Sequence, residues 1–218
     1  MTRQSASPSH ADDELSVDIR ALAFDELPAA AAILTHGMLN NPLHVKVFGA
    51  DPEHRRRRLS RFLGPLVTYV HSNGVVLGAC VQGELIGVLG MIKPGRCRPM
   101  LADRLRFALT ILASAPPTTL LLFHLWLSAR ARNDPDEPHW HIGPLAVLPE
   151  YRRRGIGRRL MLHGCQHIDT LEASAWLETD LEINAGFYRT LGFDLVRQEP
   201  VLGVPTWFMY RASADTTG

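Results

Sequence analysis

The residues best suited to chemistry lie where an apolar strand pattern passes through a short glycine-containing loop into a helix pattern. Apolar alternation over 139–147 predicts a strand, and apolar residues at helical spacing from Ile156 to Ile168 predict a helix. Between them, Gly155 and Gly157 let backbone N–H groups approach a ligand closely at a helix N-terminus, which favours anions. This stretch therefore predicts a phosphate cradle.

Five arginines crowd the same loop and the first helical turn: Arg152, Arg153, Arg154, Arg158 and Arg159. The helix macrodipole disfavours cations there by roughly 0.3–1 kcal/mol each, so the cluster makes sense if it meets an anion; a solvated basic face is the alternative. Two familiar phosphate loops are excluded. A Walker loop ends in Gly-Lys-Ser/Thr, and a dinucleotide fingerprint has a third Gly or Ala where this chain has Leu160.

The pattern Arg152-x-x-Gly155-x-Gly157, after an apolar strand ending at Val147, resembles the acetyl-coenzyme A loop of the GNAT superfamily of N-acetyltransferases. The resemblance implies that loop amides hold the pyrophosphate of acetyl-CoA and that the preceding strand hydrogen-bonds the pantetheine arm. The coenzyme-binding residues that it implies are Leu145, Ala146, Val147, Arg152, Arg153, Arg154, Gly155, Ile156, Gly157, Arg158 and Asn184. Arg153 and Arg154 make the loop more basic than the family pattern, and they either bind the 3′-phosphate or face water.

A second part of the resemblance lies about thirty residues later, in Asn184-Ala-Gly-Phe187-Tyr188 and the Gly192-Phe193 that follows. The late helix of GNAT proteins carries an Asn and a Phe-Tyr pair, so Tyr188 takes the position of the general acid that protonates the leaving thiolate. A tyrosine packed in the core is the alternative. Asn184 contacts the coenzyme arm or caps its helix.

The amine acceptor must lose a proton, and three residues are candidates for the base. His139 and His141 alternate onto the same strand face as Leu145 unless a bulge intervenes, and histidine titrates near neutrality. Glu178 on the next predicted strand is the rival, and each of the three has a purely structural alternative. Pro144, which has no N–H, marks where strand pairing stops and the coenzyme enters.

The composition is that of one globular domain, with 218 residues, 46% hydrophobic and 21% charged. A net charge of +1 gives no reason to expect nucleic acid as a partner. Three cysteines without metal-ligand spacing predict reduced thiols in the cytoplasm and no metal. We expect a disordered leader at 1–15 without a signal peptide, one N-acetyltransferase domain at 16–211 and a disordered tail at 212–218.

The elements that must position the site follow from the same patterns. The resemblance implies an α/β (α+β) fold: a mixed, mostly antiparallel central sheet of about six to seven strands, flanked by helices and splayed at the acetyl-CoA site. Alternation and apolar runs predict strands at 17–21, 74–81, 84–92, 139–147, 174–179, 193–197 and 205–211, with a hairpin turn at Gln82-Gly83. A helix is expected over 51–71, whose run Arg55–Arg58 faces solvent or, as the alternative, lies near the phosphates of the coenzyme. The segment 36–49 is expected to be a loop that lines the acceptor cleft.

A nearly uncharged run at 107–127 has the length of a membrane span. Pro116-Pro117 divides it into two pieces too short to cross a bilayer, so we expect no span. Instead, 98–132 is expected to form an apolar helical segment that serves as a wall on the substrate side.

These features together predict a cytoplasmic N-acetyltransferase that moves an acetyl group from acetyl-CoA to an amine of a small molecule, by direct attack in a ternary complex. Two alternatives stay open: a non-catalytic acetyl-CoA sensor, and an acetyltransferase of protein or peptide amines. A homodimer is compatible with the sequence.

Overall fold

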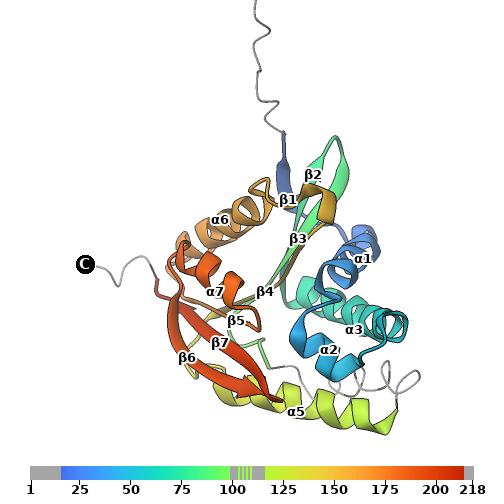
Figure 1. The fold of residues 1–218 in the computed structure, drawn as a ribbon. Helices are drawn as coiled ribbons and strands as arrows, with labels where there is room; N and C mark the ends of the chain where they lie inside the picture. The colour runs from blue at the N-terminus through green and yellow to red at the C-terminus, as the bar shows by residue number, and fades with distance from the viewer. Residues whose placement is uncertain are drawn as a thin grey trace, which may run out of the picture.

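Seven strands form one mixed sheet in the order β1-β2-β3-β4-β5-β7-β6, and helices cover both of its faces (Figure 1). The structure is a computed structural model that describes residues 16–98, 103, 105, 107, 109 and 116–213. The strands are β1 (Asp18–Ala21), β2 (Gly74–Val81), β3 (Glu84–Ile92), β4 (Trp140–Val147), β5 (Ala175–Thr179), β6 (Asp194–Val201) and β7 (Val204–Arg211). The helices are α1 (Leu27–Met38), α2 (Pro42–Phe48), α3 (Pro52–Asn73), α5 (Pro117–Asn133), α6 (Ile156–Asp169) and α7 (Glu182–Arg189), with 3₁₀ turns at Phe24–Glu26 and Pro149–Tyr151.

Neighbouring strands run antiparallel except for β4 and β5, which are parallel. This confirms the expected mixed, mostly antiparallel sheet. Two hairpins close through two-residue turns, with φ of 51° and 83° at Gln82 and Gly83, and of 53° and 80° at Leu202 and Gly203. Positive φ at both turn positions matches the twist of the flanking strands, so the hairpin predicted at Gln82-Gly83 is also confirmed.

The sheet separates two hydrophobic cores. On one face pack α1, α2, α3 and α5, whose buried side chains include Phe62 and Trp126. On the other face packs α6, whose Leu160 and Ile168 are fully buried, together with α7. Each such side chain contributes roughly 1.5–3 kcal/mol by leaving water. The apolar stripe predicted for α6 is therefore the surface that fixes this helix, and its N-terminus, against the sheet beside β4.

Helix α2 occupies most of a segment that was predicted to be a loop, so that prediction was wrong for 42–48. Pro42 at the first helical position was the local signal. The decisive contact is distant: Asp180, just after β5, accepts a hydrogen bond from Leu43 N at 2.8 Å and satisfies a free N–H of the first turn. Because these two residues are 137 positions apart, no local pattern predicts this contact.

Arg55 departs from the solvent-facing arrangement predicted for the arginine run of α3. The residue is only 4% exposed, and its guanidinium donates to three carbonyl oxygens: Leu39 O at 2.7 Å, Gly49 O at 2.8 Å and Ala50 O at 2.7 Å. Arg56 and Arg57 are exposed and pair with Glu53, as expected of a solvated face. Arg55 thus fastens the segments around α2 to α3.

The predicted leader at 1–15, much of 98–115 and the end of the tail lie outside the described residues. The described half of the apolar run is α5, which begins directly after Pro116. Within the described ranges, no helix is both long and apolar enough to cross a membrane.

Candidate active site

A β-bulge halfway along β4 shapes the site. The pairing of β3 with β4 shifts between Leu89 and Met91, so two residues of β4, Gly143 and Pro144, oppose Gly90 alone. A Cβ on Gly90 would lie 2.8 Å from Gly143 O, so the two backbones approach more closely than any side chain permits. Because of the extra residue, each later side chain of β4 points to the opposite face of the sheet from the one that simple alternation predicts.

This reversal corrects the expectation that His139 and His141 share a face with Leu145. Before the bulge, both histidines lie on the α3 and α5 side, where the ring of His139 packs 6.3 Å from that of Trp176. After the bulge, Leu145 packs with the core beneath α6. Ala146 turns to the opposite face and lies against α1, where a Cβ on Gly37 would be 2.6 Å from Ala146 Cβ.

Beyond the start of β4 the sheet opens, as the expected splay requires. Pairing of β4 with β5 is limited to Trp140 and His141. Leu148 N donates to β3 at 2.9 Å, and the alternation of an antiparallel strand therefore turns the N–H groups of Leu145 and Val147 away from β3 and toward the opening. By the same alternation Ala146 faces β3, so it lies apart from the open edge.

The loop after β4 leaves the N-terminus of α6 accessible. Gly155, at φ 75°, is the N-cap, and no described side chain caps the helix. The N–H groups of Ile156, Gly157 and Arg158 consequently have no acceptor within the helix. A Cβ on Gly157 would contact only Val147 Cγ2, at 3.9 Å, so there is space above the helix end.

The five arginines of this loop and first turn are all exposed. Four of them have contacts of their own: Arg152 Nε donates to Val147 O at 3.1 Å, Arg154 lies 5.8 Å from the Tyr151 ring, Arg158 donates to Thr190 Oγ1 at 3.0 Å, and Arg159 donates to Val17 O at 2.9 Å. Arg153 takes up a left-handed φ of 61°. The cluster surrounds the helix end, except that Arg159 reaches toward β1.

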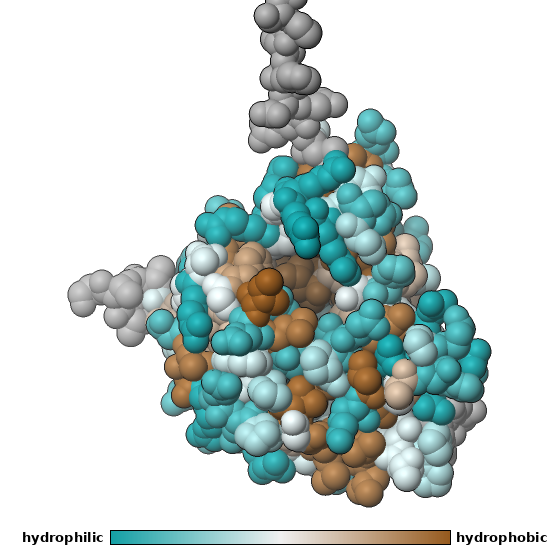
Figure 2. Space-filling view, in the orientation of Figure 1, coloured by the Kyte–Doolittle hydropathy of each residue, from teal (hydrophilic) through white to brown (hydrophobic). Residues whose placement is uncertain are grey.

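A cleft of about 920 Å³, including the part open to solvent, lies beside the open edge of β4. Phe62, Leu66 and Trp126 give it an apolar wall. The residues with polar side chains that line it are Asn41, His44, Arg130, His141, Glu178, Thr179, Asp180, Asn184, Tyr188 and Thr206. In Figure 2 the centre of the visible face is hollowed and lined by apolar side chains, with hydrophilic residues around it. The cleft thus brings together the predicted Tyr188, His141, Glu178, Asn184 and Leu145, while His139 does not line it.

Tyr188 is the phenol of the cleft. Its ring packs between Phe187 at 5.2 Å and Phe193 at 6.1 Å, centroid to centroid. Burial of the hydroxyl, together with the negative charges of Glu178 and Asp180, raises the pKa of Tyr188 well above its usual value. The phenol therefore stays protonated at neutral pH and retains a proton to donate.

Glu178 belongs to a charged network that faces the same cleft. Its carboxylate forms an ion pair with Arg130 Nε and lies 3.3 Å from His141 Nε2. Arg130 Nη2 is also 2.8 Å from His141 Nε2. Sequence reasoning missed Arg130 and Asp180, since the first lies at the end of α5 and the second after β5, and only tertiary packing brings them to the cleft.

The Acetyltransferase (GNAT) family profile matches residues 52–193. The histone acetyltransferase HPA2 and related acetyltransferase of Corynebacterium glutamicum has a TM-score of 0.71 at 21% identity, over 91% of this chain and 97% of that one. The Drosophila melanogaster polyamine N-acetyltransferase, which forms N-acetylagmatine, has 0.63 at 16% identity, over 90% and 100%. The PaiA N-acetyltransferase of Thermoplasma acidophilum, in complex with coenzyme A, has 0.54 at 15%, over 90% and 99%.

At these identities the likeness to solved structures shows a shared fold rather than a shared substrate. The family profile, in contrast, covers well over half of the chain, from the start of α3 to the exit of α7. The chain belongs to the GNAT family of acetyltransferases, enzymes that transfer an acetyl group from acetyl-CoA.

Proposed function

We propose that this chain transfers the acetyl group of acetyl-CoA directly to an amine of a small molecule with an apolar body. One observation carries the proposal: the cleft beside the open edge of β4 combines an acidic pair, Glu178 and Asp180, with the apolar wall of Phe62 and Trp126. An ammonium group meets complementary charge there, and an apolar body meets surface that would otherwise face water.

The coenzyme would lie along β4 and end at α6. The unpaired N–H groups of Ile156, Gly157 and Arg158 suit a pyrophosphate. The N–H groups of Leu145 and Val147, turned toward the opening, suit the pantetheine arm and the thioester carbonyl, whose developing negative charge such donors stabilise. Asn184 lines the cleft next to this path. The exposed Arg152, Arg153 and Arg154 would meet the 3′-phosphate.

The reaction needs two proton transfers. Glu178, whose carboxylate lies 3.3 Å from His141 Nε2, takes a proton from the incoming ammonium; the free amine nitrogen then forms a bond to the thioester carbon. The carbon–sulfur bond breaks, and Tyr188 gives its proton to the departing thiolate. The second amine proton returns to the phenol, so that the products are the amide and coenzyme A with a free thiol.

A thiol-release assay with a panel of amines tests the proposal. The panel contains arylalkylamines, linear polyamines, single amino acids and peptides with free N-termini, and product masses identify the acetylated amine. We expect the highest kcat/KM with a small amine that carries an apolar group. A preference for peptide amines would overturn the small-molecule assignment, and coenzyme binding without product from any amine would favour a sensor.

A further inference from the structure

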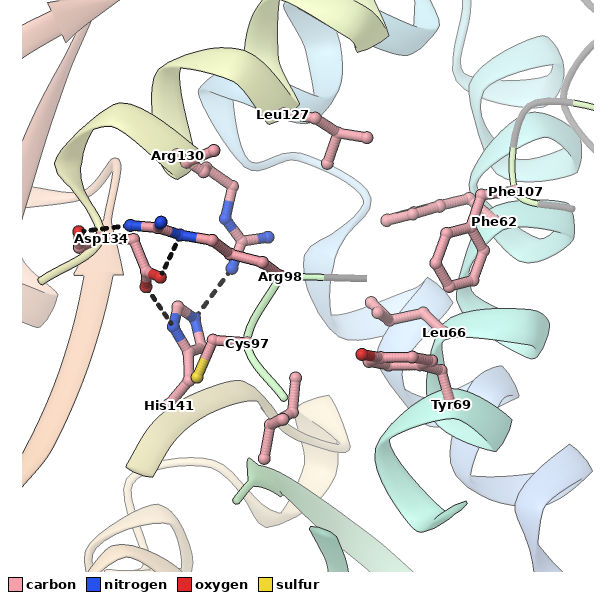
Figure 3. A pocket seen from close by; sticks show the side chains of 12 residues that line it. Phe62, Leu66, Tyr69, Cys97, Arg98, Phe107, Leu127, Arg130, Asp134 and His141 are labelled. Carbon is pink, nitrogen blue, oxygen red and sulfur yellow. Dashed lines mark hydrogen bonds and ion pairs between the residues drawn. The ribbon is translucent and has the colours of Figure 1, made fainter. Parts of the chain in front are cut away.

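Four side chains with metal-ligand chemistry meet next to the cleft. They are Cys97 from the loop after β3, Asp134 from the end of α5, and His139 and His141 from the first part of β4. One ligand atom from each of the four lies within 4.8 Å of the others. Figure 3 shows the carboxylate of Asp134 facing the ring of His141, with the thiol of Cys97 beside that histidine.

Two nitrogens of this cluster are buried without a hydrogen-bond partner. These are His139 Nε2 and His141 Nδ1. In the described part of the chain they are the two buried side-chain nitrogen or oxygen atoms without a hydrogen-bond partner. Their residues are only 3% and 7% exposed. Both nitrogens approach Asp134 Oδ1, at 3.2 and 3.9 Å, without the alignment of a hydrogen bond. A buried polar atom left without a partner costs about 1–3 kcal/mol, so two that converge on one point are suited to bind a common ligand.

The outer contacts of the cluster suit a metal. His139 Nδ1 lies 2.8 Å from Glu137 O, so Nδ1 carries the proton and the Nε2 lone pair points inward. Arg98 Nε holds Asp134 Oδ2 at 3.2 Å, which leaves Oδ1 for the cluster. These are the kinds of second contacts that orient metal ligands.

His141 requires one adjustment. A metal at Nδ1 needs the proton on Nε2, and Glu178 Oε2 at 3.3 Å is an acceptor for it. Arg130 Nη2, which now approaches the same nitrogen, would keep its ion pair with Glu178 through Nε. The network that faces the cleft thus stays charged and connected.

We propose that Cys97, Asp134, His139 and His141 form a structural binding site for a divalent metal with the preferences of zinc. Zinc favours thiolate, imidazole and carboxylate ligands in a tetrahedron, with bonds of about 2.0–2.3 Å and ligand atoms about 3.3–3.8 Å apart. The ligand atoms, all within 4.8 Å of one another, would therefore have to move closer by at most about 1–1.5 Å, through small side-chain rotations, to form a zinc tetrahedron.

Charge and connectivity support a structural role. A Cys97 thiolate and the Asp134 carboxylate together neutralise a divalent cation, and the thiol proton is released when the metal binds. Four protein ligands leave no open position for substrate, unlike a catalytic zinc. The metal would tie the loop after β3 to the end of α5 and to β4, joining Cys97 to a histidine 42 residues later in the chain.

Cobalt(II) titration of the full-length chain, after treatment with a chelator, tests the site. Tetrahedral cobalt with a thiolate ligand gives visible d–d bands and a near-ultraviolet charge-transfer band. We expect one equivalent to bind, to be displaced by zinc, and to shield one thiol from a thiol reagent. Cys97→Ser should abolish the charge-transfer band, and His139→Gln should weaken cobalt binding at least tenfold. Cys165→Ser, at a buried cysteine in the other core, is the matched control and should change neither.

Wild-type protein without the charge-transfer band would overturn the proposal. Retention of that band in Cys97→Ser would overturn it as well, and so would unchanged cobalt affinity in a folded His139→Gln variant. Circular dichroism of each apoprotein distinguishes a lost ligand from a lost fold. None of these readouts depends on acetyltransferase activity, so they stand or fall separately from the proposed reaction.

Discussion

The hydroxyl of Tyr188 is the atom on which the proposed proton transfer to the thiolate depends. Tyr188→Phe removes it and keeps the ring that packs between Phe187 and Phe193. Because the hydroxyl acts in the transition state, we expect kcat to fall roughly 10²–10⁴-fold, with little change in the KM for acetyl-CoA. Steady-state kinetics on the best acceptor measure both quantities.

Tyr210→Phe, on β7, is the control for loss of a phenol elsewhere and should leave kcat unchanged. A Tyr188→Phe enzyme as fast as wild type would remove Tyr188 from the mechanism. The raised pKa of this phenol adds a second expectation. Because the hydroxyl keeps its proton at pH values where a free tyrosine ionises, its ionisation should cause no fall in kcat at any pH up to about 10.

Gly157 tests the cradle at the end of α6. We expect Gly157→Asp to abolish acetyl-CoA binding, because the carboxylate would occupy the space above the helix end and repel a pyrophosphate. Gly157→Ala is the matched control. Its Cβ would touch only Val147 Cγ2 at 3.9 Å, and alanine stabilises a helix by roughly 0.5–1 kcal/mol over glycine. Calorimetric titration with acetyl-CoA should show binding by the alanine variant alone, and equal affinity in both variants would contradict the cradle.

At the scale of elements, the bulge of β4 depends on the absence of a side chain in β3. Gly90→Ala would place a Cβ 2.8 Å from Gly143 O and 3.0 Å from Pro144 Cδ. We expect a loss of about 1–3 kcal/mol in unfolding free energy by urea denaturation, and a higher KM for acetyl-CoA because the open edge of β4 moves. Gly64→Ala in α3, where a Cβ meets nothing within 4 Å, should not destabilise the protein. Equal stability of the two variants would contradict this prediction, because it would show that the backbone at the bulge can move to accommodate the added Cβ.

Arg55 gives a second test at this scale. Arg55→Ala removes the buried guanidinium that donates to three carbonyl oxygens around α2 and should cost about 2 kcal/mol of unfolding free energy. Arg56→Ala, one position away on the exposed side of α3, should stay within about 0.5 kcal/mol of wild type. Similar chemical-denaturation curves for both variants would contradict the anchoring role of Arg55.

Elements defined by local patterns were predictable. The hairpin at Gln82-Gly83 follows from turn chemistry, and the buried stripe of α6 follows from helical periodicity. The features that could not be predicted depend on contacts between residues far apart in the sequence. The first turn of α2 is hydrogen-bonded to Asp180. The side chains of β4 exchange faces at the bulge because Gly90 lets the backbone of Gly143 approach. Alternation correctly grouped Leu145 with Val147, but it could not place either relative to His141.

Across the whole molecule, charge is nearly balanced but unevenly distributed. The net charge is +1, yet five exposed arginines lie in the loop before α6 and in its first turn, four of them around the helix end. Attraction of a polyanionic coenzyme to this region weakens as salt shortens the screening length from about 10 Å at 0.1 M to about 3 Å at 1 M. We therefore expect the KM for acetyl-CoA to rise with ionic strength, while the KM for the amine changes less.

Arg153→Gln should raise the KM for acetyl-CoA and reduce this salt dependence. Arg57→Gln, which removes an exposed arginine from α3, should do neither. The same salt dependence in all three proteins would show that the loop arginines face water without attracting the coenzyme.

The bulge in β4 also bears on how this chain is aligned with its relatives or recombined with them. An alignment that carries simple alternation through Gly143 and Pro144 matches each later residue of the strand to one that faces the opposite layer. Chimeras joined on either side of these two residues must keep both, together with Gly90 across the ladder. A single-residue deletion at this point would turn Leu145 and Val147 toward α1 while leaving the length of the strand almost unchanged.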